Sequence, residues 1–168
     1  MVDVVRTVTL EGGVLVGHDG SKAANEGVRW AARLAAELGE PLHVLRAWGL
    51  LNAPEPPSKV GGFIPPLEDW EAAVRDDLAA DVARLGLEGE VHLHVAHEQS
   101  AAALLAAATH ARMLVVARRG AGGFRGLGFG STADQVVRHA RCPVVVVPVD
   151  GGHDDPEDLD THLRAKPE

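Results

Sequence analysis

The sequence predicts an α/β fold in which helices cover both faces of an open, mostly parallel sheet. Short apolar runs alternate with longer segments of helical periodicity along the whole chain, and this alternation is typical of parallel sheets. The 168 residues are enough for one domain with a real hydrophobic core. Aromatic residues make up only 4% of the chain, so Ala, Val and Leu must build that core.

The first part of the chain predicts two strands, one helix and a long loop. Residues 13–17 (GVLVG) are an apolar run bounded by glycines and predict a buried strand. Residues 21–38 have helical spacing and stop before Gly39. Residues 41–48 predict the second strand. Residues 49–66 are too rich in Pro and Gly for either element, and loops of this length are often lids or binding segments.

The middle of the chain repeats the pattern. Residues 67–85 return to helical periodicity, and residues 91–95 (VHLHV) predict a third strand. Ser100 can cap a helix that runs to about His110. Residues 113–117 (MLVVA) predict the fourth strand, which leads into a glycine-rich connection.

The glycine-rich connection, residues 118–130, is longer than the ~2 to 6 residues usual in α/β units. Its six glycines would let backbone N–H groups approach an anion closely. A short helix opening at Ser131 would add its unsatisfied N–H groups, and Arg118, Arg119 and Arg125 supply positive charge. The connection therefore predicts a phosphate site; a surface loop with solvated arginines remains the alternative. A fifth strand follows Pro143.

Two familiar phosphate motifs fit this connection poorly. The P-loop pattern requires a GK[ST] ending, and the only lysines are Lys22, Lys59 and Lys166. The stretch GFGSTA fits the dinucleotide pattern GxGxxA, with Asp150 about 20 residues on. However, that pattern needs its first glycine directly after the strand, and Gly128 comes too late. The spacing therefore argues against NAD.

The formal net charge of −8 is concentrated at the C-terminus. Residues 150–168 hold seven carboxylates against Arg164 and Lys166, a net charge of −5. An acidic balance with no basic stripe argues against nucleic acid or an anionic membrane as the main partner. We expect one domain over residues 1–149 and a disordered acidic tail over residues 150–168.

Other features predict a cytoplasmic protein. The lone Cys142 cannot form an internal disulfide, which suits a reducing compartment. The N-terminus lacks the basic and apolar regions of a signal peptide. The most apolar region is broken by His110 and Arg112 before it reaches the ~20 residues that span a bilayer.

Three stretches together resemble the universal stress protein family of nucleotide-binding α/β proteins. They are GVLVGHDGS at residues 13–21, a late G-x2-G-x9-G-S spacing that ends at Ser131, and CPVVVVP at residues 142–148. The resemblance runs from about Gly13 to Pro148; residues 49–90 match only in type. It implies a Rossmann-like, HUP-type sheet in the order 3-2-1-4-5, with the ligand site where the chain direction reverses between strands one and four.

The resemblance also implies which residues bind ATP, with Mg²⁺ as a possible companion of the nucleotide. The aspartate after strand one would contact the adenosine, Ala47 and Val116 would line the adenine pocket, and the glycine loop would hold ribose and phosphates. The expected cofactor-binding residues are Gly17, His18, Asp19, Ala47, Val116, Ala117, Arg119, Gly120, Gly130, Ser131 and Thr132.

The match has three departures. Ala117 stands at the first glycine of the family pattern, where a methyl group can obstruct a positive φ or close approach to phosphate. Arg112 stands where many members have aspartate, and Arg46 where histidine is common. Since part of the family does not retain nucleotide, a dimeric interaction module that leaves the pocket empty or gives it to another small anion stays open as the alternative.

A zinc site formed by the protein's own side chains is not expected. His92 and His94 share one face of a strand, with His97 soon after, and imidazoles at such spacing can bind zinc. Polar side chains on the exposed face of an edge strand are the favoured interpretation. Asp19 could hold Mg²⁺ or act as a base, but it could equally cap the helix that begins near Ser21.

No catalytic residues are expected either. The chain has no GxSxG motif, and Ser131, Asp134 and His139 are too far apart on one short helix to form a relay. The sequence therefore predicts an ATP-binding sensor or switch in stress response, with slow ATPase activity at most. A homodimer through the last strand, residues 144–148, is the expected assembly, with no nucleic-acid or membrane partner and an unidentified protein partner. A true adenylating enzyme is a third possibility.

Overall fold

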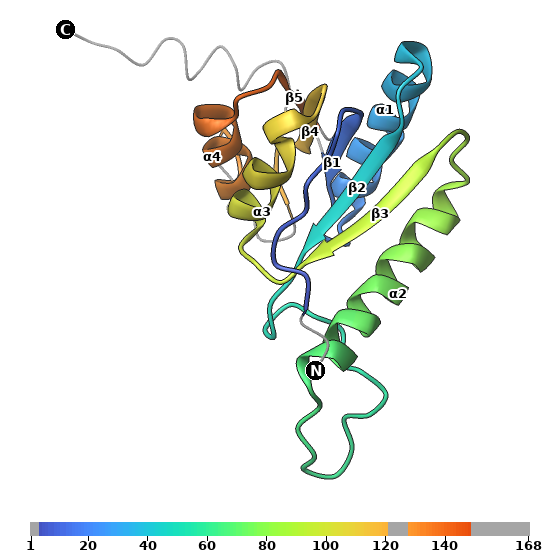
Figure 1. Ribbon diagram of the computed structural model, residues 1–168, viewed down its shortest axis with the longest axis vertical. Coiled ribbons are helices and arrows are strands. Elements are labelled where there is room, and N and C mark those ends of the chain that lie inside the picture. The colour runs from blue at the N-terminus through green and yellow to red at the C-terminus, as the bar shows by residue number, and fades with distance from the viewer. Residues whose placement is uncertain (1–3, 121–127, 149–168) are drawn as a thin grey trace, which may run out of the picture.

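The computed structural model describes residues 4–120 and 128–148, which form one five-stranded sheet flanked by helices (Figure 1). All four strand pairings are parallel, and the order is β3-β2-β1-β4-β5. The predicted fold class and strand order are thus confirmed. The strands are β1 Val14–Gly17, β2 Leu42–Ala47, β3 Val91–Ala96, β4 Met113–Ala117 and β5 Val144–Val147.

Helices cover both faces of the sheet, as the alternating pattern predicts (Figure 1). The helices are α1 Lys22–Leu38, α2 Leu67–Leu85, α3 Ser100–Ala107 with a 3₁₀ turn Ala108–His110, and α4 Ser131–His139. Side chains of α1 and α2 pack into one hydrophobic cluster and those of α3 and α4 into another. The strands alternate between the two clusters, so Val14 and Val16 face α1 while Leu15 faces α3.

Two helix starts differ from the sequence-based expectation. Ser21, not Asp19, caps α1, because its Oγ accepts the Ala24 N–H at 3.0 Å. Asp19 Oδ1 instead accepts the Ser21 N–H at 2.9 Å, which fixes the turn before the helix. Ser100 is the first helical residue of α3 and Gln99 occupies the cap position, so the expected Ser100 cap is wrong. The α-helical part also ends at Ala107, earlier than expected.

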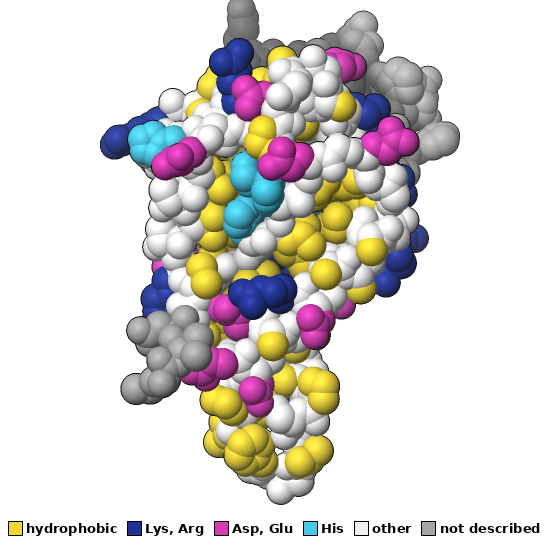
Figure 2. All heavy atoms as spheres, turned by 45° about the vertical axis from the view of Figure 1, so that its right-hand side comes forward, with side chains coloured by type: hydrophobic (Ala, Val, Ile, Leu, Met, Phe, Trp, Pro, Cys, Tyr) yellow, Lys and Arg dark blue, Asp and Glu magenta, His cyan; other side chains and the backbone are white. Residues whose placement is uncertain are grey.

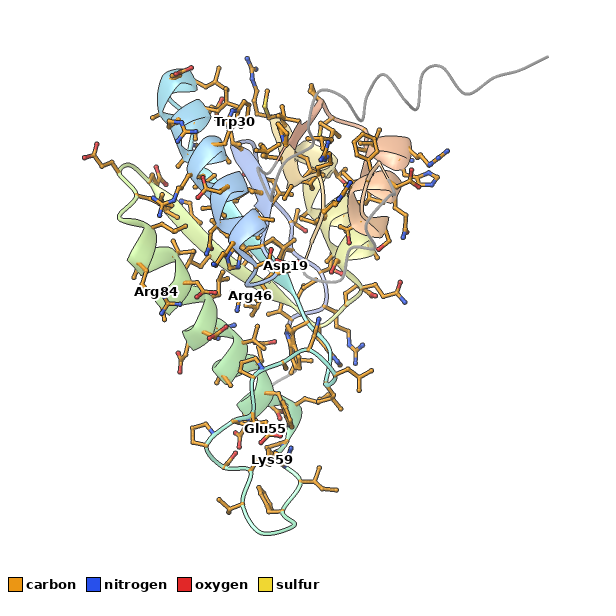
Figure 3. The ribbon with its side chains drawn as sticks, turned by 180° about the vertical axis from the view of Figure 1, so that it is seen from behind. Asp19, Trp30, Arg46, Glu55, Lys59 and Arg84 are labelled. Carbon is orange, nitrogen blue, oxygen red and sulfur yellow. The ribbon has the colours of Figure 1, made fainter. Side chains whose placement is uncertain are left out.

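The loop between β2 and α2, residues 48–66, contains no helix or strand, as its Pro and Gly content predicts. It projects from one end of the molecule (Figure 1) and carries exposed apolar side chains (Figure 2): Leu50, Leu51, Val60, Phe63 and Ile64. Lys59 and Glu55 form an ion pair in this loop (Figure 3). The Lys59 ammonium group also lies over the ring of Trp70 in a cation–π contact, which connects the far part of the loop to α2.

Within the described residues, no helix has the length and apolar character needed to cross a membrane. Cys142 is a free, partly buried cysteine, and burial raises the pKa of its thiol. The expected acidic tail, residues 150–168, and Arg125 of the glycine-rich connection lie outside the described residues.

Candidate functional site

A cavity of about 330 Å³ opens at the carboxyl ends of β1, β2 and β4. It lies where the strand order reverses, which is where open α/β sheets bind ligands. Its volume is within the range of roughly 300–1,000 Å³ typical of small-molecule sites. All of the residues expected to bind a cofactor line it: Gly17, His18, Asp19, Ala47, Val116, Ala117, Arg119, Gly120, Gly130, Ser131 and Thr132.

The N-terminus of α4 forms one wall of this cavity. Gly130 is the N-cap and has no side chain to accept a capping hydrogen bond, so the first-turn N–H groups keep their donor capacity. Ser131, Thr132 and Ala133 line the cavity from that first turn. The Gly130 N–H donates to the Arg118 carbonyl at 2.8 Å, which holds the helix start against the end of β4. This wall can bind an anion through N–H groups and the positive end of the helix dipole.

Asp19 and Gly120 are in close contact in the lining of the cavity. A Cβ atom built on Gly120 would lie 2.6 Å from Asp19 Oδ2, so any side chain at this position would displace the carboxylate. Gly130 is also close to this backbone, because a Cβ there would lie 3.5 Å from the Gly120 nitrogen. The two glycines therefore let main chain, rather than side chains, form the floor beside Asp19.

Two arginines add positive charge to the same wall. Arg118 and Arg119 follow β4 and both line the cavity. The Nε of Arg119 is buried and has no hydrogen-bond partner among the residues that the structure describes. A buried donor without a partner costs free energy unless a water or ligand satisfies it. This donor, the uncapped helix and the glycine floor together fit a negatively charged ligand.

Ala117, which replaces a glycine of the family pattern, is accommodated without strain. No non-glycine residue in the described ranges has a positive φ, so Ala117 does not need the conformation that glycine provides. Its methyl group points towards α1, where a Cβ built on Gly27 would lie 3.9 Å away. The alanine therefore packs beneath the helix, and Val116 is the β4 side chain that faces the α3–α4 side of the cavity.

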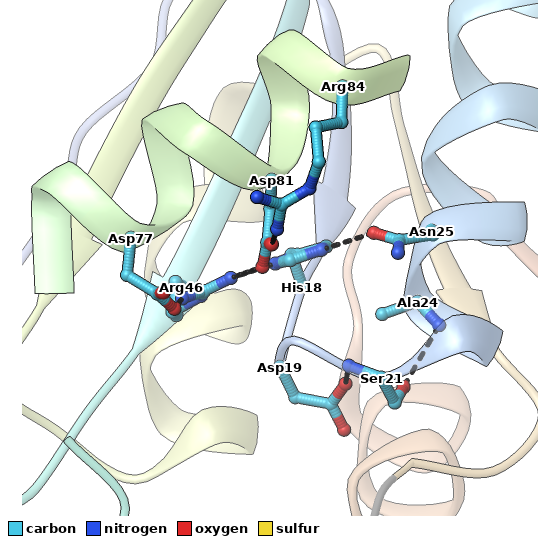
Figure 4. Close-up of polar contacts among 9 residues, drawn as sticks. All are labelled: His18, Asp19, Ser21, Ala24, Asn25, Arg46, Asp77, Asp81 and Arg84. Atoms are coloured by element: carbon cyan, nitrogen blue, oxygen red, sulfur yellow. Dashed lines mark hydrogen bonds and ion pairs between the residues drawn. The ribbon is translucent and has the colours of Figure 1, made fainter. Parts of the chain in front are cut away.

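His18 is held by a buried polar network behind the cavity (Figure 4). Its Nδ1 lies 2.7 Å from Arg46 Nη2, and its Nε2 lies 2.8 Å from Asn25 Oδ1. Since arginine can only donate, Nδ1 must accept and Nε2 must carry the proton. Burial lowers the pKa of His18 below its ordinary value, and the positive charge of Arg46 acts in the same direction. His18 is therefore a neutral imidazole with a fixed orientation.

Arg46 joins this network to α2. Its Nη1 contacts Asp77 Oδ2 at 2.5 Å and its Nη2 contacts Asp81 Oδ2 at 2.7 Å. Asp81 is also paired with Arg84 on the outer side (Figure 4). Arg46 is only 6% exposed, so the two carboxylates offset the cost of burying its charge. These contacts thus explain why an arginine can occupy position 46, where histidine is common in the family.

Sequence reasoning missed several cavity-lining residues: Ser21, Ala24, Leu45, Asn52, Ser100, Leu104 and Ala133. Leu45 could have been found, because it lies two residues before Ala47 on the same strand face. Asn52 lies in the long loop that the sequence marks as a possible binding segment, but nothing in the sequence singles it out. Its Oδ1 accepts the Gly49 N–H at 2.7 Å, which directs the amide group.

The histidines of β3 lie away from the cavity. His43 of β2 contacts His94 at 3.0 Å between ring nitrogens and stacks on His92, and histidine side chains gather on the surface in Figure 2. Burial and the neighbouring histidines lower the pKa of His94 to about 4. His97 instead stacks on Trp48. In the described ranges, no three His, Cys, Asp or Glu side chains are grouped as metal ligands.

Comparison with known protein families shows which family the sequence of this chain matches. The sequence profile of the Universal stress protein family matches residues 13–148. The chain belongs to the universal stress protein family. Curated family members include Universal stress protein Rv2623 of Mycobacterium tuberculosis, which is 32% identical over 145 residues. A Mycolicibacterium smegmatis universal stress protein is 33% identical over 141 residues.

The alignments with these family members leave about half of each relative unmatched. The alignments cover 80% of this chain but only 47% of Rv2623 and 45% of the M. smegmatis protein. The chain therefore spans about half the length of the curated relatives that it matches.

Solved universal stress proteins share the fold at lower sequence identity. UspA from Lactobacillus plantarum superposes with a TM-score of 0.63 at 18% identity, covering 84% of this chain and 99% of UspA. A universal stress protein in complex with cAMP has a TM-score of 0.56 at 21% identity, covering 87% and 98%. The Archaeoglobus fulgidus protein in complex with dAMP has a TM-score of 0.50 at 24% identity, covering 80% and 95%.

Proposed function

We propose that this universal stress protein binds ATP, with Mg²⁺ accompanying the triphosphate, in the cavity at the ends of β1, β2 and β4. The observation that carries the proposal is the meeting of Asp19, Gly120 and the uncapped N-terminus of α4 around one cavity. Adenine nucleotides occupy two solved family members, one with cAMP and one with dAMP, which supports an adenine nucleotide as the ligand class.

The residues divide into a base end and a phosphate end. Ala47 and Val116 offer small apolar surface suited to a flat base, and Asp19 offers a carboxylate suited to ribose hydroxyls. Ser131, Thr132 and the Arg119 guanidinium offer donors suited to phosphate oxygens. Bound Mg²⁺ would neutralise part of the triphosphate charge. We assign no residue a catalytic role, and turnover would be slow at most.

A nucleotide held in this way can act as a switch. The cavity is lined by residues of α1, α3 and α4 and of the β2–α2 loop, so a ligand would contact segments from both layers of helices. If it binds one arrangement of these segments better than another, it shifts their populations, and a partner protein can detect the difference. We expect the protein to act in this way in the cytoplasm during stress response.

The ligand proposal is tested by extracting the purified protein with acid and assaying adenine nucleotide, followed by calorimetric titration with ATP and Mg²⁺. We expect saturable binding, which Gly120→Ala should weaken because its Cβ would displace the Asp19 carboxylate from its position in the cavity. Gly128→Ala is the matched control, since a Cβ there meets nothing within 4 Å. Absence of bound nucleotide and of heat at millimolar ATP would leave the alternative, a dimeric interaction module of the same fold.

The proposed assembly is a homodimer through β5, one of the two edge strands of the described sheet. The carbonyl of Pro143 accepts the N–H of Leu114 in β4, and the carbonyl of Val147 accepts the N–H of Arg118, which directly follows β4. Because backbone groups alternate in direction along a strand, those of Val144 and Val146 point to the open edge. Val146→Pro removes an outward N–H and should give a monomer in light scattering, whereas Val146→Ala should remain dimeric. A wild-type monomer at all concentrations would contradict this assembly.

A further inference from the structure

The outer side of α1 carries a basic groove that the proposed nucleotide site does not use. The groove measures about 550 Å³ and is lined by Lys22, Arg29 and Arg33 with one carboxylate, Glu26. Trp30 forms an apolar patch in it, on the side of α1 that approaches β5 (Figure 3). The groove therefore combines three cationic side chains with an aromatic surface on a protein whose net charge is −8.

Two of these cations have no counter-charge within the described part of the chain. Glu26 and Arg29 form an exposed pair at 3.6 Å, and Arg29 also donates to the Leu85 carbonyl at 3.4 Å. Lys22 and Arg33 form no ion pair with any described residue, and both are exposed. In contrast, Arg46, Arg75, Arg84 and Arg138 are each paired with a carboxylate.

The chain itself brings carboxylates to this groove. Pro148, the last described residue, lines the groove together with Val147. The following residues include Asp154, Asp155, Glu157, Asp158 and Asp160 in a segment of net charge −5. Asp154 is six residues beyond Pro148, so an extended chain can carry it up to ~20 Å. Lys22 and Arg33 are ~16 Å apart along the helix axis, so every cation is within reach.

We infer that the acidic segment 150–168 binds along the basic face of α1 in the same molecule. Each exposed ion pair is worth only ~0.2–1 kcal/mol. However, the covalent connection at Pro148 supplies an effective concentration on the order of millimolar. The association needs no fixed fold of the segment, and its dependence on exposed charges makes it sensitive to salt.

This interaction would lie beside the nucleotide cavity. Ser21 and Ala24 line the cavity, whereas Lys22 and Asn25 of the same helical turn line the groove. Carboxylates bound at Lys22 would therefore add negative charge near the place proposed for the phosphates. The binding of the segment itself does not require a nucleotide, so it can be tested whether or not the proposed function holds.

Carbodiimide cross-linking of the full chain tests the inference, because the chain has only three lysines. Amide bonds between carboxylates of residues 154–160 and Lys22 should be the main long-range products identified by mass spectrometry. Lys59 of the β2–α2 loop is the internal control. We expect Lys22 products to fall several-fold in 0.5 M NaCl, and tail products with Lys59 to remain minor. Equal yields at Lys22 and Lys59, or salt-insensitive yields, would overturn the inference.

A charge reversal within the groove provides the second arm. Arg33→Glu leaves Lys22 in place and removes a side chain with no ion pair in the described residues, and it should reduce Lys22 products several-fold. Arg141→Glu changes the net charge equally at an exposed site outside the groove. This variant should not reduce the yield of Lys22 products. A 1:1 mixture of ¹⁴N- and ¹⁵N-labelled protein should give only unmixed products; mixed products would show binding between molecules and overturn the inference.

Discussion

The guanidinium of Arg46 lies 2.7 Å from Nδ1 of His18, and this contact decides which ring nitrogen of His18 carries its proton. Because the Arg46 side chain extends from β2 to α2 while His18 follows β1, one buried cation connects three elements behind the cavity. The wall of the candidate nucleotide site therefore depends on charges that never contact the ligand.

Replacement of Arg46 by methionine should destabilise the protein by ~3–5 kcal/mol, because Asp81 would remain buried without its inner partner. Urea denaturation followed by circular dichroism measures this change. Arg84→Met is the matched control, since Arg84 pairs with the same carboxylate but is 69% exposed. That variant should lose less than ~1 kcal/mol. Similar losses for both variants would contradict a central role for Arg46.

Stability should fall as the pH drops from 6.5 towards 4. The folded-state pKa of His94 is lowered to about 4 from 6.5, chiefly by burial, and burial also lowers the pKa of His18 and of His43. Between these pH values the unfolded chain binds more protons than the folded one, so acid favours unfolding. Urea midpoints at pH 7.5 and 5.0 should show the loss. His94→Gln should flatten the dependence, and exposed His139→Gln should leave it unchanged.

Asn52→Ala should weaken the binding of ATP by ~2- to 10-fold, the equivalent of one hydrogen bond. The Asn52 Oδ1 accepts the Gly49 N–H and Asn52 lines the cavity, so we expect its NH₂ group to be the donor to a ligand. Calorimetric titration gives the affinity, and the urea midpoint should change little. Lys59→Ala, in the same loop but outside the cavity lining, serves as the control. An unchanged affinity for Asn52→Ala would remove Asn52 from the binding site.

Gly27→Ala should stabilise the protein by up to ~1 kcal/mol. Gly27 lies inside α1 without a positive φ, and a Cβ there would make ordinary contacts of 3.8 and 3.9 Å with Ala117. The substitution gains helix propensity without a collision. Gly39→Ala should have the opposite effect, because Gly39 ends the same helix at φ 66°. Thermal denaturation of the two variants compares the signs directly.

The sequence predicted the strands and the cavity positions more accurately than it predicted the side-chain contacts within them. The strand after Gly13 is recognisable because both of its faces are buried, which requires a continuous apolar run. The glycine spacing up to Ser131 located the cavity wall because backbone approach requires that residue type. Helix caps at Ser21 and Gln99 were harder to predict, since neighbouring polar residues compete for one position.

The long-range polar contacts could not be predicted from one sequence. Nothing local to Arg46 indicates that Asp77 and Asp81, more than thirty positions away, would approach it. The same holds for Asn52, which reaches the cavity only because the long loop folds back at its start. Such contacts depend on how α2 lies on the sheet, and periodicity alone does not fix that arrangement.

Because all five strands run in the same direction, the turns that lead into strands and the loops that follow strands lie at opposite ends of the sheet. Turns that lead from helices into strands, such as Gly86 to Glu90 before β3, lie at the edge opposite the cavity. Gly86 and Gly89 both have positive φ values, and Glu88 between them is exposed. A fluorescent reporter could therefore be inserted after Glu88, where it would sit a full strand length from the cavity and leave the cavity walls intact.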